Sequence, residues 1–212
     1  HSQVFNGSVK YRTQFTINWH SICQGDPQCI SQMENIPNSS LTFWNLDFNE
    51  NESLYTKIDS IADIENVKKI WEAGMDPNEF DPNQNVYINN INKTVNTFVS
   101  YFDFYVSDTL KLANVKIEAE QKDILGYKCI KASTGTACEI WFSPEIPLPY
   151  GPSDNYGLPG MILEISCNAQ GVHTVITAYE ILVNKNVSIT KPKAKYVSKT
   201  EYEKLIEDLQ NR

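Results

Sequence analysis

Four acidic side chains surround the most unusual segment of the sequence and are its first candidates for acid and base chemistry. They are Glu139, Glu145, Asp154 and Glu164, which flank or lie within a stretch rich in proline and glycine. Glycoside hydrolases use a pair of carboxyl groups that flank the glycosidic bond to be cleaved. A sheet protein also scatters acids over the solvent side of its strands, and the spacing here singles out no pair. We therefore predict no catalytic residue and a chain that works by binding, not as an enzyme.

The histidines do not improve the case for catalysis. There are three of them, at positions 1, 20 and 173. A hydrolase needs a nucleophile beside a base, and the base needs an orienting group. His173 has Thr174 and Thr177 nearby in a β-type segment, but the sequence contains no Gly-x-Ser-x-Gly elbow. We interpret His173 as a surface or packing residue.

Two of the five cysteines close a short polar loop. Cys23 and Cys29 bracket Gln-Gly-Asp-Pro-Gln, the kind of segment that a disulfide staples. The metal alternative adds His20 to the two thiols, but it lacks a fourth nearby ligand and any Cys-x-x-Cys spacing. We expect a disulfide here, no metal site and no cofactor.

The other cysteines lie in segments with β-type patterns. If the strand predicted at 161–167 runs back beside that at 137–143, Cys138 comes close to Cys167. We therefore expect a second disulfide between them and Cys129 as a small buried apolar side chain, with a redox role for Cys129 as the alternative. Disulfides indicate an oxidising compartment, so the chain is expected to be exported.

Charge and hydropathy exclude several classes of partner. The formal net charge of −8 argues against a nucleic-acid or anionic-membrane surface, because both attract Lys and Arg. No apolar run approaches the roughly 20 residues of a membrane-spanning helix. The chain begins with His1 and not with Met, which we interpret as a processed product. Basic residues gather late in the sequence, and we interpret them as a solvated terminal strand and linker: Lys185, Lys191, Lys193, Lys195 and Lys199.

Alternation with a period of two dominates the sequence. From Val9 to Trp19, apolar side chains fall on one face and polar ones on the other, as in a half-buried strand. Further strands are predicted near 41–48, 53–58, 85–91, 95–106, 113–121, 124–133, 137–143, 161–167 and 172–183. Helical spacing occurs at 58–72 and again after Ser198, where Glu201 completes a capping box and the helix is expected to pack on its own sheet.

These elements predict a mainly β protein with minor α+β character. Short turns between successive strands favour an antiparallel meander, curled into one sheet that forms a barrel or half-barrel of about ten strands. A C-terminal amphipathic helix and a short helix near 58–72 complete the prediction. No linker or repeat divides the sequence, so residues 1–212 are expected to form a single domain.

The 144–160 loop is the best candidate for a binding segment. It holds five prolines and three glycines, which preclude a central strand and favour a stiff, ordered connection. Long loops within compact domains are often functional, so we expect this one either to contact a partner or to seal one end of the barrel. The residues expected to bind are Leu148, Tyr150, Tyr156, Gly157, Leu158, Pro159 and Gly160.

The same segment carries a resemblance to a known family. Gly-Leu-Pro-Gly-Met-Ile at 157–162 resembles the signature of the GLPGLI family of envelope proteins from Bacteroidetes-type bacteria. The flanking Leu-Gly-Tyr-Lys-Cys-Ile-Lys-Ala at 125–132 and Trp-Phe-Ser-Pro-Glu-Ile-Pro at 141–147 are similar too. A weaker similarity lies at 46–49 and 53–55. Met161 stands where the family name has Leu, a near-isosteric change.

The resemblance implies an exported, β-rich protein of uncharacterised function, located in the periplasm or at the periphery of the outer membrane. We accordingly expect a binding or accessory protein whose 144–160 loop contacts an envelope protein, with an outer-membrane transport component among the candidates. The alternative is a periplasmic carrier of a lipid or another small apolar ligand, held in a half-barrel pocket.

Overall fold

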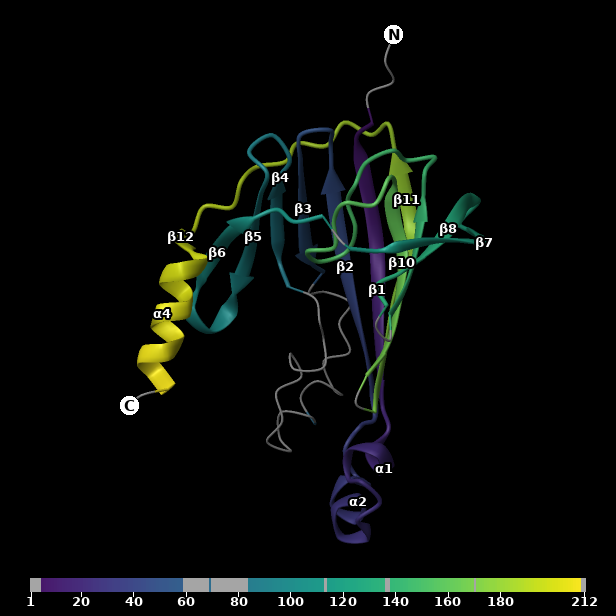
Figure 1. The fold of residues 1–212 in the computed structure, drawn as a ribbon, viewed down its shortest axis with the longest axis vertical. Coiled ribbons are helices and arrows are strands. Elements are labelled where there is room, and N and C mark those ends of the chain that lie inside the picture. Colours follow the sequence, from purple (N-terminus) through teal and green to yellow (C-terminus); the bar gives the residue numbers. More distant parts are fainter. Residues whose placement is uncertain are drawn as a thin grey trace.

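The computed structural model is a single open sheet with a small helical lobe at one end and a helix along one edge (Figure 1). It describes residues 5–58, 69, 84–112, 114–135, 138–169 and 171–210. The strands are β1 Gly7–Ile17, β2 Ser39–Phe48, β3 Glu52–Lys57, β4 Val86–Asn89, β5 Thr94–Val99, β6 Phe104–Thr109, β7 Lys116–Ile124, β8 Tyr127–Ser133, β9 Cys138–Ser143, β10 Met161–Ala169, β11 Val172–Val183 and β12 Lys195–Ser198. The helices are α1 Trp19–Ile22, α2 Pro27–Met33, the 3-10 turn η3 Ser100–Phe102 and α4 Lys199–Gln210.

Two antiparallel meanders meet at the central strand β1. The strand order is β12-β6-β5-β4-β3-β2-β1-β11-β10-β9-β8-β7, so β2 to β6 lie on one side of β1 and β11 to β7 on the other. Only the β12–β6 pair among the described strands is parallel. The mainly β, single curled sheet is thus confirmed, and its linear strand order leaves it open.

Alternation along β1 places one face in the core and the other in solvent. Val9, Tyr11 and Phe15 are almost fully buried, whereas Arg12 and Gln14 are exposed. Since side chains of a strand point alternately to opposite faces, the same parity continues into β2 and β11 through the pairing register. The sheet therefore has an inner, apolar face and an outer, polar face.

The inner face is filled by the long connection between β9 and β10. The Tyr11 hydroxyl donates to the Ile162 carbonyl at 2.7 Å, which ties β1 to the start of β10. The Tyr156 hydroxyl donates to the Asn90 side-chain oxygen at 2.5 Å, in the turn between β4 and β5. Residues of this connection belong to the same apolar cluster as the strands on both sides of β1.

Both predicted disulfides are present. Cys23 is bonded to Cys29, and Cys138 to Cys167 across the β9–β10 pair. The fifth cysteine, Cys129, is a buried free thiol. Two disulfides are typical of proteins that mature outside the reducing cytoplasm, which identifies the chain as exported.

Some expected elements differ in the structure. The segment 95–106, expected to be one strand, is divided between β5 and β6 by the turn η3, and Asp103 after it has a left-handed φ of 52°. The helices α1 and α2 were not predicted, because each is short and lacks an apolar stripe. The helix expected at 58–72 lies for the most part outside the described residues. None of the described helices has the length and apolar character needed to cross a bilayer.

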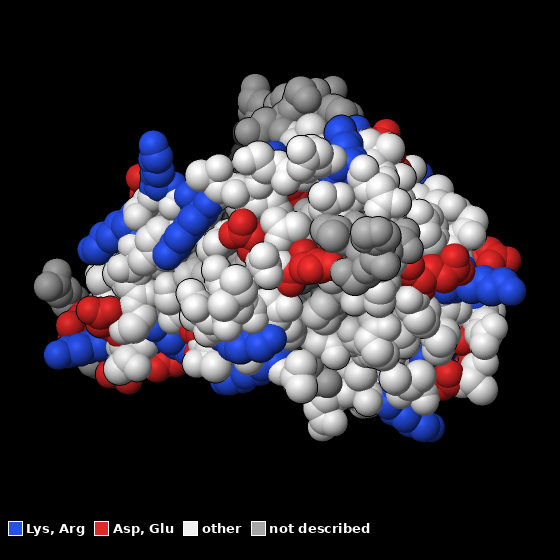
Figure 2. All heavy atoms as spheres, turned by 90° about the horizontal axis from the view of Figure 1, so that it is seen from above, with Lys and Arg blue, Asp and Glu red and all other residues white. Residues whose placement is uncertain are grey.

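The late lysines make local contacts at the β12 edge. The Lys191 ammonium lies 4.1 Å from the centre of the Tyr196 ring, and Lys199 pairs with Asp108 at 3.1 Å. Seen from above, Lys and Arg side chains gather on the left of the molecule, with acidic side chains beside them (Figure 2). They therefore cover the sheet edge, as expected of a solvated terminal strand.

Candidate functional site

The 144–160 loop is part of the core, not an exposed binding surface. Leu148 is 7% exposed, Tyr150 0%, Tyr156 6% and Leu158 2%. These were the side chains expected to anchor a partner, and they face the inner side of the sheet. Among the other loop residues expected to bind, Pro159 is exposed, Gly157 is half-buried and Gly160 is buried. The side chains expected to contact a partner are therefore buried, and their burial fits the alternative that the loop seals the inner face of the sheet.

Loop geometry also explains the glycines that carried the family resemblance. A Cβ on Gly160 would lie 2.3 Å from the Ser143 carbonyl oxygen, so only glycine fits there. Gly157 has a φ of +105°, which other residues rarely adopt. The glycines of the Gly-Leu-Pro-Gly motif are therefore explained by the packing and backbone conformation of this loop.

The four acids first considered for catalysis do not converge on one cavity. Glu164 pairs with Lys122 at 2.6 Å, Glu139 pairs with Lys131 at 2.8 Å, and Glu145 accepts the Lys128 amide N–H at 2.8 Å. Asp154 is exposed in the loop. Each of the first three is held by a local interaction, and no pair among the four is arranged across a shared pocket.

His173 lies beside a serine on the outer face. Its Nε2 is 3.2 Å from the Ser166 hydroxyl. A nucleophile and base pair of this kind also needs a group that orients the imidazole, and no such partner of His173 appears among the described residues. The pair is therefore a polar surface contact in the structure, as expected from the sequence.

A regular, mostly polar platform covers the outer face of β2, β1, β11 and β10, with Phe43, Leu41 and Val175 as its apolar members. Side chains of equal parity form rows across the four strands, with about 5 Å between neighbours in a row. Arg12, Gln14 and Thr16 of β1 occupy the middle of these rows. The rows, read in register from β2 to β10, are Phe43, Arg12, Thr177, Glu164; Leu41, Gln14, Val175, Ser166; and Ser39, Thr16, His173, Asn168.

Two hollows open on this platform. One, of about 410 Å³, is lined by Thr16, Asn18, Ser21, Asn168, Gly171 and His173. The other, of about 160 Å³, is lined by Arg12, Gln14, Ser39, Ser40 and Leu41. Their side chains are mainly hydroxyl, amide, imidazole and guanidinium groups, which both donate and accept hydrogen bonds.

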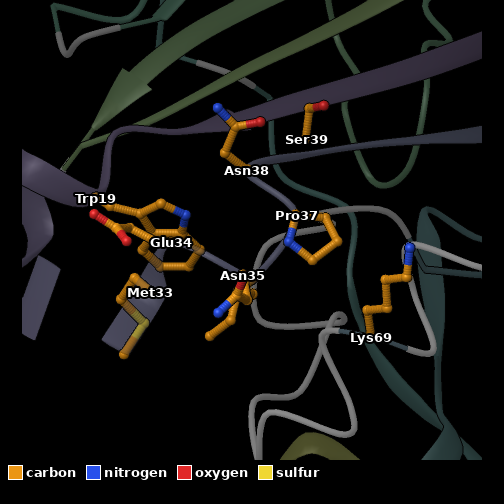
Figure 3. A pocket seen from close by; sticks show the side chains of 9 residues that line it. Trp19, Met33, Glu34, Asn35, Pro37, Asn38, Ser39 and Lys69 are labelled. Carbon is orange, nitrogen blue, oxygen red and sulfur yellow. The ribbon is translucent and has the colours of Figure 1, made fainter. Parts of the chain in front are cut away.

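A third hollow, of about 490 Å³, lies where the sheet joins the helical lobe (Figure 3). Trp19 forms one side, and the segment after α2 forms most of the rest. Its lining residues are Trp19, Met33, Glu34, Asn35, Ile36, Pro37, Asn38, Ser39 and Lys69. Ser39 also lines the smaller platform hollow, so the two adjoin.

This arrangement is suited to binding a neutral polar ligand. Among the described residues, no group of three or more His, Cys, Asp or Glu side chains could hold a metal ion. Apart from His173, which was considered as a base, the residues of the three hollows were not identified from the sequence. The signals available were the exposed polar positions of β1 and a tryptophan beside a disulfide loop, and both also fit ordinary surface residues.

Comparison with known families gives a match over most of the chain. Residues 55–206 match the family described as N-glycanase peptide, N-terminal domain. No curated protein matches the chain. The family match contradicts the resemblance to GLPGLI proteins and the expected functions of an envelope binding protein and of a lipid carrier. The expected envelope-protein partner is not tested and stays a prediction.

Solved structures with the same fold agree with the family match. PNGF-II in one crystal form superposes with a TM-score of 0.56 and 19% identity, covering 95% of this chain and 33% of that one. A second crystal form of PNGF-II gives 0.52 and 18%, with coverage of 94% and 33%. The chain thus spans about a third of the length of these structures.

Proposed function

The chain belongs to the family described as N-glycanase peptide, N-terminal domain, and on that premise we propose that it engages the glycosylated polypeptide on which an N-glycanase acts. An N-glycanase releases an N-linked glycan from a polypeptide. In this proposal the present domain supplies binding to the glycosylated substrate, and the hydrolysis takes place elsewhere in such an enzyme.

The outer-face platform is the observation that carries the proposal. Oligosaccharides present many hydroxyl groups and few charges, so they are bound by groups that both donate and accept hydrogen bonds. Gln14, Thr16 and Asn168 offer such groups on rigid strands, and Arg12 and His173 add donors. Strands hold these side chains in fixed register, which lowers the entropy lost on binding.

The carboxyl groups with resolved pKa shifts are held ionised by local hydrogen bonds and lie outside the platform. A general acid at neutral pH needs a raised pKa, which burial or a neighbouring negative charge produces. In the described residues the resolved shifts of carboxyl groups are all in the other direction. Hydrogen bonds from Lys199 and from Ser133 lower the pKa values of Asp108 and Glu118, and the Ser198 hydroxyl does so for Glu201.

The place of action follows from the same proposal. The two disulfides fit an exported protein, and the periplasm or the periphery of the outer membrane remains the predicted location.

Binding to a matched pair of substrates tests the proposal. One glycoprotein with a single N-glycan, and the same polypeptide without it, are titrated into the chain by calorimetry. We expect heat of binding only with the glycosylated form, and loss of binding in the exposed double variant Arg12→Ala/Gln14→Ala. Lys116→Ala, exposed on the distant edge strand β7, is the matched control and should bind as the wild type does.

Equal binding to both forms, or to neither, would refute the proposed role. Release of free glycan is followed by chromatography in the same mixtures. Glycan released by this chain alone would show that the domain is catalytic, contrary to the proposal.

A further inference from the structure

We infer that the hollow beside Trp19 is a subsite for one neutral pyranose unit of an oligosaccharide. The inference rests on the proposed function, because it locates the sugar at one place on the surface that engages the glycosylated substrate. It is carried by the ring that walls the hollow, by the polar groups around it and by their charge.

The indole ring is a rigid wall. Trp19 packs beside the small apolar cluster of Phe15 and Ile17, while it also lines the hollow. The Asn18 side chain caps the following turn by accepting the Ser21 amide N–H at 3.1 Å, which fixes the backbone at this position. A flat aromatic face held in this way suits the C–H face of a pyranose, which is the apolar side of a sugar.

Polar groups lie around the ring in a charge-balanced set. Asn35 and Asn38 are exposed amides that can donate to and accept from sugar hydroxyls. Among the described lining residues, Glu34 contributes one negative charge and Lys69 one positive charge, so their formal charges balance. Figure 3 shows Glu34 beside the indole and Lys69 on the opposite side of the hollow. A balanced lining favours a neutral ligand over a phosphate or another polyanion.

The Trp19 indole nitrogen has an unused donor. Its N–H is buried and has no hydrogen-bond partner among the residues that the structure describes. Leaving a buried donor unsatisfied costs free energy, and buried tryptophan N–H groups normally find a partner. Packing against Phe15 and Ile17 holds the ring, and the indole N–H is a sensitive probe of a ligand that enters the hollow.

The lobe that forms the hollow is braced. The Cys23–Cys29 disulfide joins α1 to α2, and the Asp26 side chain caps α2 by accepting the Gln28 amide N–H at 3.0 Å. At the other side, Ser39 is shared with the hollow next to Arg12 and Gln14. An oligosaccharide with one unit at Trp19 can therefore extend along the platform.

The indole N–H resonances of the four tryptophans provide the test. The chain is titrated with N,N′-diacetylchitobiose and with mannotriose, and inorganic phosphate serves as the anionic probe. We expect one indole resonance to move with either neutral sugar and none with phosphate. Trp19→Phe retains an aromatic wall and identifies the resonance by its disappearance.

A pair of exposed variants measures the contribution of the amides. Asn35→Ala should weaken sugar binding roughly fivefold, the loss of about one hydrogen bond. Gln32→Ala, exposed on α2 and outside the hollow, is the matched control and should leave the affinity unchanged.

The outcomes separate this inference from the proposed function. If the glycoprotein binds but no sugar moves the Trp19 resonance, the subsite is refuted and the proposed function stands. If sugars move it but the intact glycoprotein does not bind, the subsite stands and the proposed function fails. A response to phosphate equal to that of the sugars would also overturn the inference, because the site would then not select for neutral ligands.

Discussion

Shortening Leu158 in the sealing loop should destabilise the fold strongly. Leu158 is 2% exposed and belongs to the main apolar cluster, together with strands from both sides of β1. Replacing a buried leucine by alanine typically costs 2–5 kcal/mol, and the cost is larger where the surroundings cannot close the cavity. The backbone at Gly160 packs closely against Ser143, so relaxation of the loop is limited. We expect Leu158→Ala to lower the free energy of unfolding by about 3 kcal/mol and the melting temperature by about 6–12 °C.

Urea unfolding followed by tryptophan fluorescence measures the effect, with calorimetry as a second readout. The m value should stay constant, because the surface exposed on unfolding is almost the same. Asp154→Ala, exposed in the same loop, is the control and should change stability by less than about 0.5 kcal/mol. A loss below about 1 kcal/mol in Leu158→Ala would show that the loop unfolds separately from the sheet and does not seal it.

Three further changes test other parts of the fold. Replacing both Cys138 and Cys167 by Ala should lower the free energy of unfolding by about 3–4 kcal/mol, because the disulfide closes a loop with a sequence separation of 29. Reducing-agent titration with urea unfolding measures the loss. An unchanged urea midpoint would contradict this prediction. Tyr11→Phe should cost about 1–2 kcal/mol in thermal unfolding, because the Ile162 carbonyl loses its buried donor, and a neutral result would mean that water replaces the hydroxyl. Burial raises the pKa of the Cys129 thiol to about 11, so above about pH 9 the unfolded chain releases this proton while the folded chain keeps it. The free energy of unfolding should therefore fall between about pH 9 and 11. If the stability of a Cys129→Ala variant falls equally steeply over this range, this cause is refuted.

The strand pattern could be predicted because one face of the sheet is buried along most of its strands. In β1, β2 and β11, alternate residues are buried, and in β1 the buried positions are mostly apolar, so the period indicates both the strand and its inner face. The pattern failed at Phe102, where aromatic residues continue through a turn that the sequence does not punctuate with Gly or Pro. Composition alone does not separate this turn from the strands beside it, because Tyr101 is 84% exposed and Phe102 half-buried although both are aromatic.

The candidate site could not be predicted for the opposite reason. Arg12, Gln14 and Thr16 look like any solvent face of a strand, and only the pairing of β1 with β2 and β11 places them on one platform. Trp19 reads as the last apolar residue of a strand, whereas it begins α1. Conversely, the 144–160 loop looked functional because proline and glycine are conspicuous, yet those residues meet packing demands.

The position of β1 in the sheet has a consequence for folding. β1 pairs with β11 in a register that joins Gly7 to Val183, so this contact spans most of the sequence. The two meanders consist of neighbouring strands and can form early, whereas the central seam closes only when the distant strand β11 is available. Until then β1 has an unpaired edge, which is a site for aggregation. Folding of this domain should therefore be slow and limited by a late closing step, and a chain arriving from its N-terminal end needs protection of β1 during export.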